Sequence, residues 1–175
     1  TGKLITFAEG GSPLKKCVNI KQLLRQSVVT ALRGSDIVCD FFFVDDIYDV
    51  LIDAGQVQQV INNVVINARE AMVNGGELQV RAENQDLGEN DGFDLTPGPY
   101  IKISITDQGV GIPQENLAKI FDPYFTTKKM ASQRGTGFGL AICYSIMRKH
   151  DGTITVESEN GKGTTFHMYL PACSS

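Results

Sequence analysis

The sequence predicts an α/β (α+β) fold: a two-layer sandwich in which one mixed β-sheet is covered on one face by helices. Three observations support this prediction. Apolar and polar residues alternate along residues 100–106, which is typical of a strand with one buried face. Apolar residues recur at helical spacing along residues 56–73. Two strand-like segments near the C-terminus are joined by Asn160-Gly161, a pair that favours a tight hairpin, so these strands lie side by side.

The helices are identified by their start and stop signals. The first follows the capping residue Asn19 and ends at Gly34, because glycine favours the backbone turn that terminates a helix. The second, residues 56–73, is stopped by Asn74-Gly75-Gly76. The third follows a glycine-rich segment and ends at about His150.

The strands alternate with these helices along the chain. Residues 84–98 are rich in Gly, Asp, Asn and Pro, which predicts a surface loop between two strands. The six predicted strands are residues 37–44, 48–52, 77–83, 100–106, 153–159 and 163–170. Because the last two are adjacent while others are separated by helices, we expect a mixed sheet.

Length and composition indicate one soluble domain. The chain has 175 residues, of which 42% are hydrophobic, and this is enough to bury a core of ordinary size. A formal net charge of −4 and the lack of a basic stripe argue against nucleic acid as a partner. The sequence has neither an apolar run of about 18 residues nor a signal-peptide pattern, so we expect a cytoplasmic location, with an upstream membrane anchor left open.

The first residues predict a boundary. Leu4-Ile5-Thr6-Phe7-Ala8 followed by Gly10-Gly11-Ser12-Pro13 is typical of the last turns of a helix that breaks into a linker. We therefore expect residues 1–13 to be the remnant of a preceding helix plus linker, and residues 14–175 to form the domain.

No CxxC pair occurs among the four cysteines, Cys17, Cys39, Cys143 and Cys173. This scattering, in a chain with two histidines, disfavours both a zinc site and a disulfide framework. We therefore expect reduced thiols, as in cytosolic proteins.

The candidate chemistry gathers between Asp107 and Leu140. Asp107 ends a predicted strand beside Gly109 and Gly111, so its carboxylate can accept hydrogen bonds from a ligand that approaches the backbone closely. A second glycine cluster, residues 135–139, leads into the third helix, whose first amides can hold phosphate. The polar stretch between the two clusters indicates a flap over a bound molecule.

Asn63 and Asn67 stand one turn apart along one edge of the apolar stripe of residues 56–73. Asparagine is a poor helix former, so the pair calls for an explanation. One interpretation is a solvated helix edge. The other is that the two amide oxygens help to bind a hard cation such as Mg²⁺ together with phosphate and water. The spacing alone leaves both open.

Together these motifs resemble the catalytic and ATP-binding domain of sensor histidine kinases, in the GHKL family. The counterparts occur in family order and are Asn63-Val64-Val65-Ile66-Asn67-Ala68 (N box), Asp107-Gln108-Gly109-Val110-Gly111 (G1 box), Phe121-Asp122-Pro123-Tyr124-Phe125 (F box), Gly135-Thr136-Gly137-Phe138-Gly139-Leu140 (G2 box) and the closing Gly163-Thr164-Thr165-Phe166. Among these kinases, the residues of the motifs are most similar to those of the nitrogen-regulator branch. The resemblance implies the Bergerat ATP-binding fold.

The resemblance also implies roles for individual residues. Asp107 would accept a hydrogen bond from the exocyclic amine of adenine, with Thr165 nearby, and Asn67 with Asn63 would hold Mg²⁺. Asn63 and Lys128 are the implied catalytic residues, and an ATP lid would span about residues 113–137. The implied ATP contacts are Asn63, Asn67, Ala71, Asp107, Gly109, Gly111, Ile112, Lys128, Gly135, Thr136, Gly137, Phe138, Gly139, Leu140 and Thr165.

Two departures from the family pattern matter. Many relatives carry a basic residue three positions after the second N-box asparagine, where this chain has Glu70 next to Arg69. The lid residues Lys128, Lys129 and Arg134 are then the candidates for the cation that neutralises phosphate. The second departure is that neither histidine, His150 nor His167, stands in the setting of a phosphoacceptor, so we expect both to be structural.

The sequence therefore predicts a protein-histidine kinase module with ATP and Mg²⁺ as its cofactors. It would pass the γ-phosphoryl group to a histidine on a separate dimerisation domain of the same protein, from which a response regulator would be phosphorylated. The isolated chain is expected to be a monomer that binds nucleotide without phosphorylating itself, and the full-length protein a homodimer. Three alternatives stay open: a GHKL ATPase, an anti-sigma-type serine kinase, and a non-catalytic nucleotide-gated interaction module. An amide at Asn63 disfavours hydrolysis, because it cannot take a proton from water at neutral pH.

Overall fold

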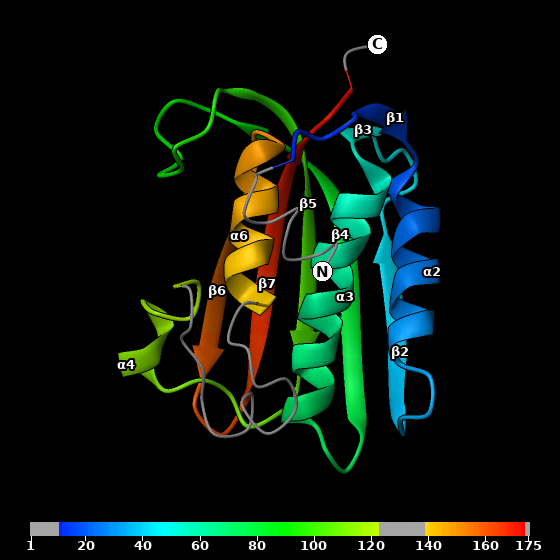
Figure 1. Ribbon diagram of the computed structural model, residues 1–175, viewed down its shortest axis with the longest axis vertical. Coiled ribbons are helices and arrows are strands. Elements are labelled where there is room, and N and C mark those ends of the chain that lie inside the picture. The colour runs from blue at the N-terminus through cyan, green and yellow to red at the C-terminus, as the bar shows by residue number, and fades with distance from the viewer. Residues whose placement is uncertain (1–10, 123–138, 174–175) are drawn as a thin grey trace.

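The computed structural model describes residues 11–122 and 139–173. In this part of the chain, a five-stranded mixed sheet carries its helices on one face, as the sequence predicts (Figure 1). The sheet strands are β2 (Ile37–Phe43), β4 (Gly76–Leu87), β5 (Gly98–Asp107), β6 (Thr153–Glu159) and β7 (Gly163–Pro171). The helices are α2 (Ile20–Ala31), α3 (Ala54–Ala71), the short α4 (Gln114–Leu117) and α6 (Gly139–Lys149).

The strand order is β2-β4-β5-β7-β6, with β2 and β4 parallel and the other neighbours antiparallel. β5 is therefore the central strand. Its last residue, Asp107, pairs with Leu78 of β4 on one side and with Thr164 of β7 on the other. Because both neighbours hold the strand at its end, the position of Asp107 is set by the whole sheet.

The core lies between the sheet and the three long helices. On α3 the apolar stripe predicted from helical spacing is buried, and Val60, Ile61 and Val64 share one core with Ile101 and Ile103 of β5. Fully burying such a side chain contributes about 1.5–3 kcal/mol relative to exposure. The N-terminus of α3 is capped by Asp53, whose carboxylate accepts a hydrogen bond from the amide of Gln56.

The two ends of the sandwich have different neighbours (Figure 1). The start of α3, the end of α6 and the C-terminal end of β7 lie at one end. The end of α3, the start of α6 and the Asp107 end of β5 lie at the other. Of the described helices, none combines the length and the apolar character needed to cross a membrane.

The sequence analysis misses part of β4 and β5. Residues 84–87 belong to β4 and Gly98 begins β5, although composition predicted a loop over 84–98. The two strands remain paired as far as Leu87 and Gly98, and Leu87 packs with Tyr100 and Tyr169 in a second, smaller apolar cluster. Long-range pairing and packing therefore override the local preference for a loop.

A small two-stranded sheet, β1 (Lys16–Val18) with β3 (Val50–Ile52), was also only partly predicted, since no strand was expected at β1. It lies beside the C-terminal end of β7 (Figure 1). The isolated bridge between Val50 and Ala172 joins the end of the chain to this small sheet.

At that junction Cys17 and Cys173 form a disulfide, with a Cα–Cα distance of 6.0 Å across 156 residues of sequence. The expectation of reduced thiols is therefore wrong for this pair. Local spacing could not predict the bond, because β1 and the chain end meet only through pairing with β3. Cys39 is a free thiol, as expected.

His150 is a structural residue in this fold, as the sequence analysis expected. It is fully buried, its Nδ1 donates a hydrogen bond to the carbonyl of Ile146 (2.9 Å), and its Nε2 accepts one from the amide of Asp53 (3.1 Å). The neutral ring thus joins the end of α6 to the start of α3. Burial lowers the pKa of His150 below its ordinary value.

This burial predicts a stability that depends on pH. Below the ordinary pKa of 6.5, the unfolded chain binds a proton at His150 that the folded chain resists, so stability falls as pH falls until the lower folded pKa is reached. Between about pH 7.5 and pH 5.5, urea unfolding should show a larger loss for the wild type than for His150→Gln. The difference in slope should be at most about 1.4 kcal/mol per pH unit. Parallel curves for the two proteins would contradict this assignment.

Candidate functional site

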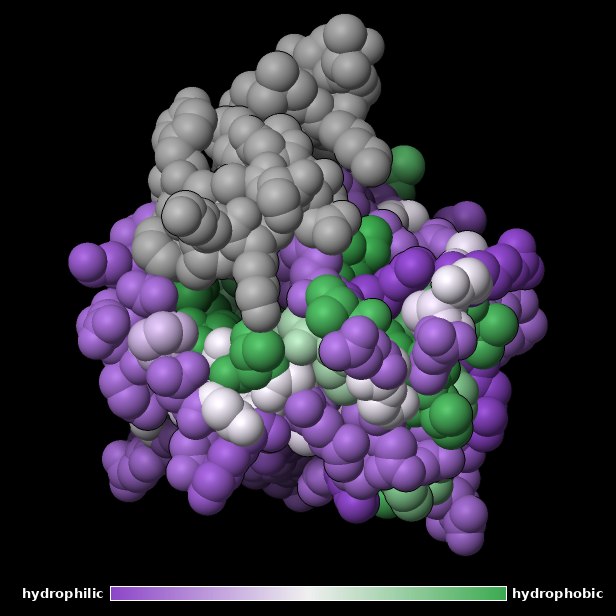
Figure 2. Space-filling model, turned by 90° about the horizontal axis from the view of Figure 1, so that it is seen from below, coloured by the Kyte–Doolittle hydropathy of each residue, from purple (hydrophilic) through white to green (hydrophobic). Residues whose placement is uncertain are grey.

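A pocket opens at the end of the sandwich where β5 finishes. Seen from this end, apolar side chains gather in the middle of a largely hydrophilic surface (Figure 2). The cavity has a volume of about 90 Å³ and opens outward into solvent. Its lining residues are Asn67, Glu70, Ala71, Asp107, Val110, Gly111, Ile112, Pro113, Ile120, Leu140, Thr164 and Phe166.

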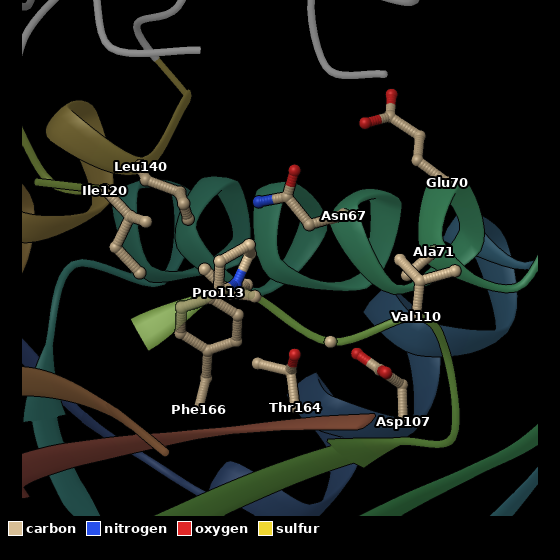
Figure 3. A pocket seen from close by; sticks show the side chains of 12 residues that line it. Asn67, Glu70, Ala71, Asp107, Val110, Pro113, Ile120, Leu140, Thr164 and Phe166 are labelled. Carbon is tan, nitrogen blue, oxygen red and sulfur yellow. The ribbon is translucent and has the colours of Figure 1, made fainter. Parts of the chain in front are cut away.

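Asp107 is the polar anchor of this pocket. Its carboxylate points from the sheet toward α3 (Figure 3). Thr164 lines the pocket from the same side. The residue is only 6% exposed, and Oδ1 accepts a hydrogen bond of 2.8 Å from the amide of Gly109. Burial raises the pKa of Asp107, against the opposing effect of backbone hydrogen bonds from Gly109 and Thr164.

The pocket threonine is Thr164, whereas the family resemblance pointed to Thr165. Thr164 is buried and lines the pocket, while the hydroxyl of Thr165 contacts that of Thr106 at 2.9 Å and does not line it. Thr164 therefore lines this pocket and Thr165 does not. The reason is the two-residue period of a strand, which turns neighbouring side chains to opposite faces of the sheet.

The glycines after Asp107 are required by contacts within the protein. A Cβ atom at Gly109 would lie 2.5 Å from the Cβ of Ala71 and 2.6 Å from its carbonyl oxygen. Gly111 has a φ of +76°, and a Cβ there would lie 2.2 Å from the carbonyl oxygen of Glu159. The loop thus needs both glycines to fit against α3 and β6, and this fit brings Gly111 into the pocket wall.

α3 forms the opposite wall through Asn67, Glu70 and Ala71 (Figure 3). Their spacing of three and four residues places them on one helix face. In Figure 3 the amide of Asn67 and the carboxylate of Glu70 both point away from Asp107. Arg69, the cation next to Glu70, instead donates hydrogen bonds to the carbonyls of Ala31 and Arg33, so it is directed to the end of α2.

Asn63 has a different position from Asn67. It is 7% exposed, does not line the pocket, and donates a hydrogen bond of 3.2 Å from Nδ2 to the carbonyl of Gly139. This bond connects α3 with the first residue of α6. A side-chain donor at this point helps to hold the start of α6, whose next residue, Leu140, lines the pocket.

The remaining walls are apolar. Ile112, Leu140 and Phe166 surround the space in front of Asp107, and Phe121 packs against Phe166 with ring centroids 6.4 Å apart. A narrow apolar space with one buried carboxylate suits a flat, mostly apolar ring that carries a hydrogen-bond donor.

The structure brings together six of the predicted site residues: Asn67, Ala71, Asp107, Gly111, Ile112 and Leu140. Gly109 and Gly139 lie next to the pocket in sequence without lining it. Lys128, Gly135, Thr136, Gly137 and Phe138, together with Lys129, Arg134 and most of the expected lid, lie outside the described residues.

Sequence reasoning missed six lining residues: Glu70, Val110, Pro113, Ile120, Thr164 and Phe166. For Thr164 and Phe166 a signal was available, because the alternation of β7 places both on the face that carries the core. Ile120 offered no such signal. It reaches the pocket only because the chain folds back after α4, and it is 3% exposed.

The pocket offers limited protein ligands for a metal. Among residues 11–122 and 139–173, no group of three or more His, Cys, Asp or Glu side chains is placed to hold an ion. Asn67 is nevertheless an amide that lines the pocket. Mg²⁺ in proteins usually keeps several water ligands and binds one or two protein side chains together with substrate phosphates. The single amide oxygen of Asn67 is compatible with this kind of coordination.

Comparison with known proteins places this chain among proteins of the histidine kinase type. The family model described as "Histidine kinase-, DNA gyrase B-, and HSP90-like ATPase" matches residues 52–174. The sensor kinase CckA of Brucella abortus is 40% identical over 82% of this chain and 15% of its own length. The sensor histidine kinase ZraS of Escherichia coli K12 is 39% identical over 73% of this chain and 24% of its own length. The chain therefore spans less than a quarter of these curated relatives.

A solved structure shows the same arrangement. The mycobacterial sensor histidine kinase MprB superposes with a TM-score of 0.74 at 26% identity, over 93% of this chain and all of that one.

The packing at Gly109 yields a test. Gly109→Ala should lower the free energy of unfolding by about 1–3 kcal/mol, because the added methyl group must displace the backbone of Ala71. Gly139→Ala is the matched control, since a Cβ there meets no atom of the described residues within 4 Å and alanine favours a helix. Chemical denaturation would measure both. Equal stability of the two variants would contradict the packing requirement.

Proposed function

We propose that this chain, which belongs to the histidine kinase-, DNA gyrase B- and HSP90-like ATPase family, binds the adenine of ATP in its Asp107 pocket. The γ-phosphoryl group of this ATP would then be transferred to a histidine. The chain is a catalytic ATP-binding domain of the sensor histidine kinase type. The acceptor histidine would belong to a separate dimerisation domain of the full-length protein. A response regulator would then take the phosphoryl group.

The observation that carries this proposal is one buried carboxylate beside the apolar walls of the pocket. Asp107 can accept a hydrogen bond from the exocyclic amine of adenine, while Ile112, Leu140 and Phe166 contact the ring. A carboxylate held away from water discriminates strongly against a ring without a donor, because it would then remain buried and unpaired.

The phosphates would extend from the adenine toward α3 and the start of α6. Bound Mg²⁺ would neutralise phosphate charge. Asn67, which lines the pocket, would be the protein ligand of this Mg²⁺. Asn63 would act as a positioning residue, because its amide already donates to Gly139 at the start of α6.

Positive charge for the γ-phosphate must come from elsewhere in the chain. The charged side chains among the described lining residues, Glu70 and Asp107, are both acidic. We therefore keep Lys128, in the expected lid, as the candidate for this role and for catalysis together with Asn63. Phosphoryl transfer depends mainly on positioning and charge neutralisation, so such a site needs no nucleophile of its own.

For the full-length protein we propose a cytoplasmic catalytic domain in a homodimer, with residues 1–13 as the connection to the preceding dimerisation domain. The sensor kinases among the relatives support this arrangement. An ATPase that activates water is not favoured, since Asn63 offers an amide where a base would be needed.

Asp107→Asn tests the pocket. Loss of the charged acceptor should weaken adenine-nucleotide binding by about 1.5–3 kcal/mol, or roughly ten- to a hundredfold in Kd by calorimetry. Because burial raises the pKa of Asp107, the charge opposes folding at neutral pH, and the amide variant should melt no lower than the wild type. Unchanged nucleotide affinity would place the adenine site elsewhere.

A pair of neighbouring threonines gives the control. Thr164→Val should weaken nucleotide binding by about 0.5–1.5 kcal/mol, as expected for one lost hydrogen bond. Thr165→Val is the same change on the other face of the sheet, and its nucleotide affinity should remain within about twofold. The opposite order would restore Thr165 as the pocket residue.

Phosphoryl transfer is tested with a second polypeptide. The chain would be incubated with Mg²⁺, γ-labelled ATP and the histidine-bearing helical domain of the full-length protein. We expect acid-labile phosphate on that domain, none on the chain alone, and strongly reduced transfer with Asp107→Asn. Acid-stable labelling of a serine would instead support a serine kinase, and release of free phosphate without labelling would support an ATPase.

A further inference from the structure

The disulfide lies where the chain enters and leaves the domain. Cys17 is in β1, opposite Leu51 of β3, and Cys173 follows β7 with its amide donating a hydrogen bond of 2.8 Å to the carbonyl of Asp49. β3 and Asp49, the residue before it, thus hold the two cysteines through their backbone. Cys17 is exposed and Cys173 is half-buried, so the bond is accessible to small thiols.

We propose that Cys17 and Cys173 form a reversible redox site, at which thiol–disulfide exchange with a low-molecular-weight disulfide such as oxidised glutathione anchors the segment that enters the domain ahead of β1. Disulfides of proteins in reducing compartments are usually transient and regulatory. The proposal does not depend on the assignment of the nucleotide pocket.

The chemistry balances in two exchange steps. The thiolate of one cysteine attacks a sulfur of oxidised glutathione, the S–S bond breaks, and one glutathione thiolate leaves. The second cysteine then attacks the protein sulfur of the mixed disulfide and expels the other glutathione thiolate. The two cysteine protons end on the two glutathione molecules, both cysteines are oxidised, and one glutathione disulfide is reduced.

Backbone contacts keep the two thiols within reach after reduction. The pairs Lys16–Ile52, Cys17–Leu51 and Val18–Val50 hold β1 on β3. At the other side, the amides of Ala172 and Cys173 donate hydrogen bonds to the carbonyls of Pro99 and Asp49. Since neither set of contacts involves sulfur, the bond can open and close again without refolding of the domain.

The other two cysteines are poorly suited to compete. Cys143 is fully buried. Burial and, secondarily, the nearby charge of Asp40 raise the pKa of Cys39 to about 11, so little of the reactive thiolate is present near neutral pH. Exchange is therefore directed to Cys17 and Cys173.

The anchored segment has few other attachments to the domain. The amide of Leu14 donates a hydrogen bond of 3.0 Å to Oδ2 of Asp53, the residue that caps α3. Lys15 pairs with Asp151, whose side chain is 78% exposed, and such an ion pair stabilises little in water. In the reduced protein, a three-residue strand and these contacts hold the entering chain, so the covalent bond decides how firmly it is attached.

The test uses the 175-residue chain in buffers with a series of ratios of reduced to oxidised glutathione. After quenching with acid and alkylation, mass spectrometry of peptides would count the blocked thiols at each position. We expect Cys17 and Cys173 to change together from disulfide to alkylated thiol within the series, with Cys39→Ser giving the same curve. A bond that persists at every ratio, or never forms, would overturn the proposal.

Hydrogen exchange then tests the anchoring itself. Amides of β1 and β3 should exchange at least about tenfold faster in the reduced than in the oxidised wild type, while those in the middle of β5 and β7 stay unchanged. Cys17→Ser and Cys173→Ser should match the reduced protein under both conditions, and reduction of the wild type remains informative if either variant folds poorly. Equal exchange of β1 in both redox states would overturn the proposal.

Nucleotide affinity gives an independent readout. The pocket lies at the opposite end of α3 from the disulfide (Figure 1), so affinity in the oxidised and reduced states should agree within about twofold. A larger change would show that the redox state acts on the pocket, and it would overturn the assignment to the entering segment.

Discussion

The site depends on one costly placement, a carboxylate buried at the end of the central strand. Asp107 resists burial, as the upward direction of its pKa shows, and it stays in position because both neighbouring strands pair with it. Gly109 then lets the chain turn tightly against Ala71, and the amide of Gly109 partly compensates the carboxylate. Burial of this charge therefore lowers the stability of the folded domain, and a ligand that donates a hydrogen bond to Asp107 would offset the loss.

α3 links the two ends of the molecule. Its N-terminus is capped by Asp53, which also contacts the entering chain through Leu14 and the end of α6 through His150. Its C-terminal half supplies Asn67 and Ala71 to the pocket. A helix with its middle buried in the core can therefore hold the entry point and the pocket in a fixed relation.

The family motifs and the physical contacts explain the same residues in different ways. Glycines expected to let the backbone approach a base are required first by the packing of the protein on itself, at Ala71 and Glu159. Of the two asparagines expected to bind a metal, Asn67 lines the pocket, while Asn63 connects α3 to α6 through a hydrogen bond to Gly139. A motif can therefore contain residues that act on the ligand and residues that only shape the site.

The sandwich, the three long helices, six of the strands in outline and the place of Asp107 at a strand end could be predicted from the sequence. These follow from local signals: helical and strand periodicity, caps, and a carboxylate at a strand end. Three features required the folded chain: Thr164 rather than Thr165 lines the pocket, β4 extends to Leu87, and Cys17 meets Cys173. Each of these depends on which strands pair and in what register, and such long-range contacts leave no periodic mark in the segments they join.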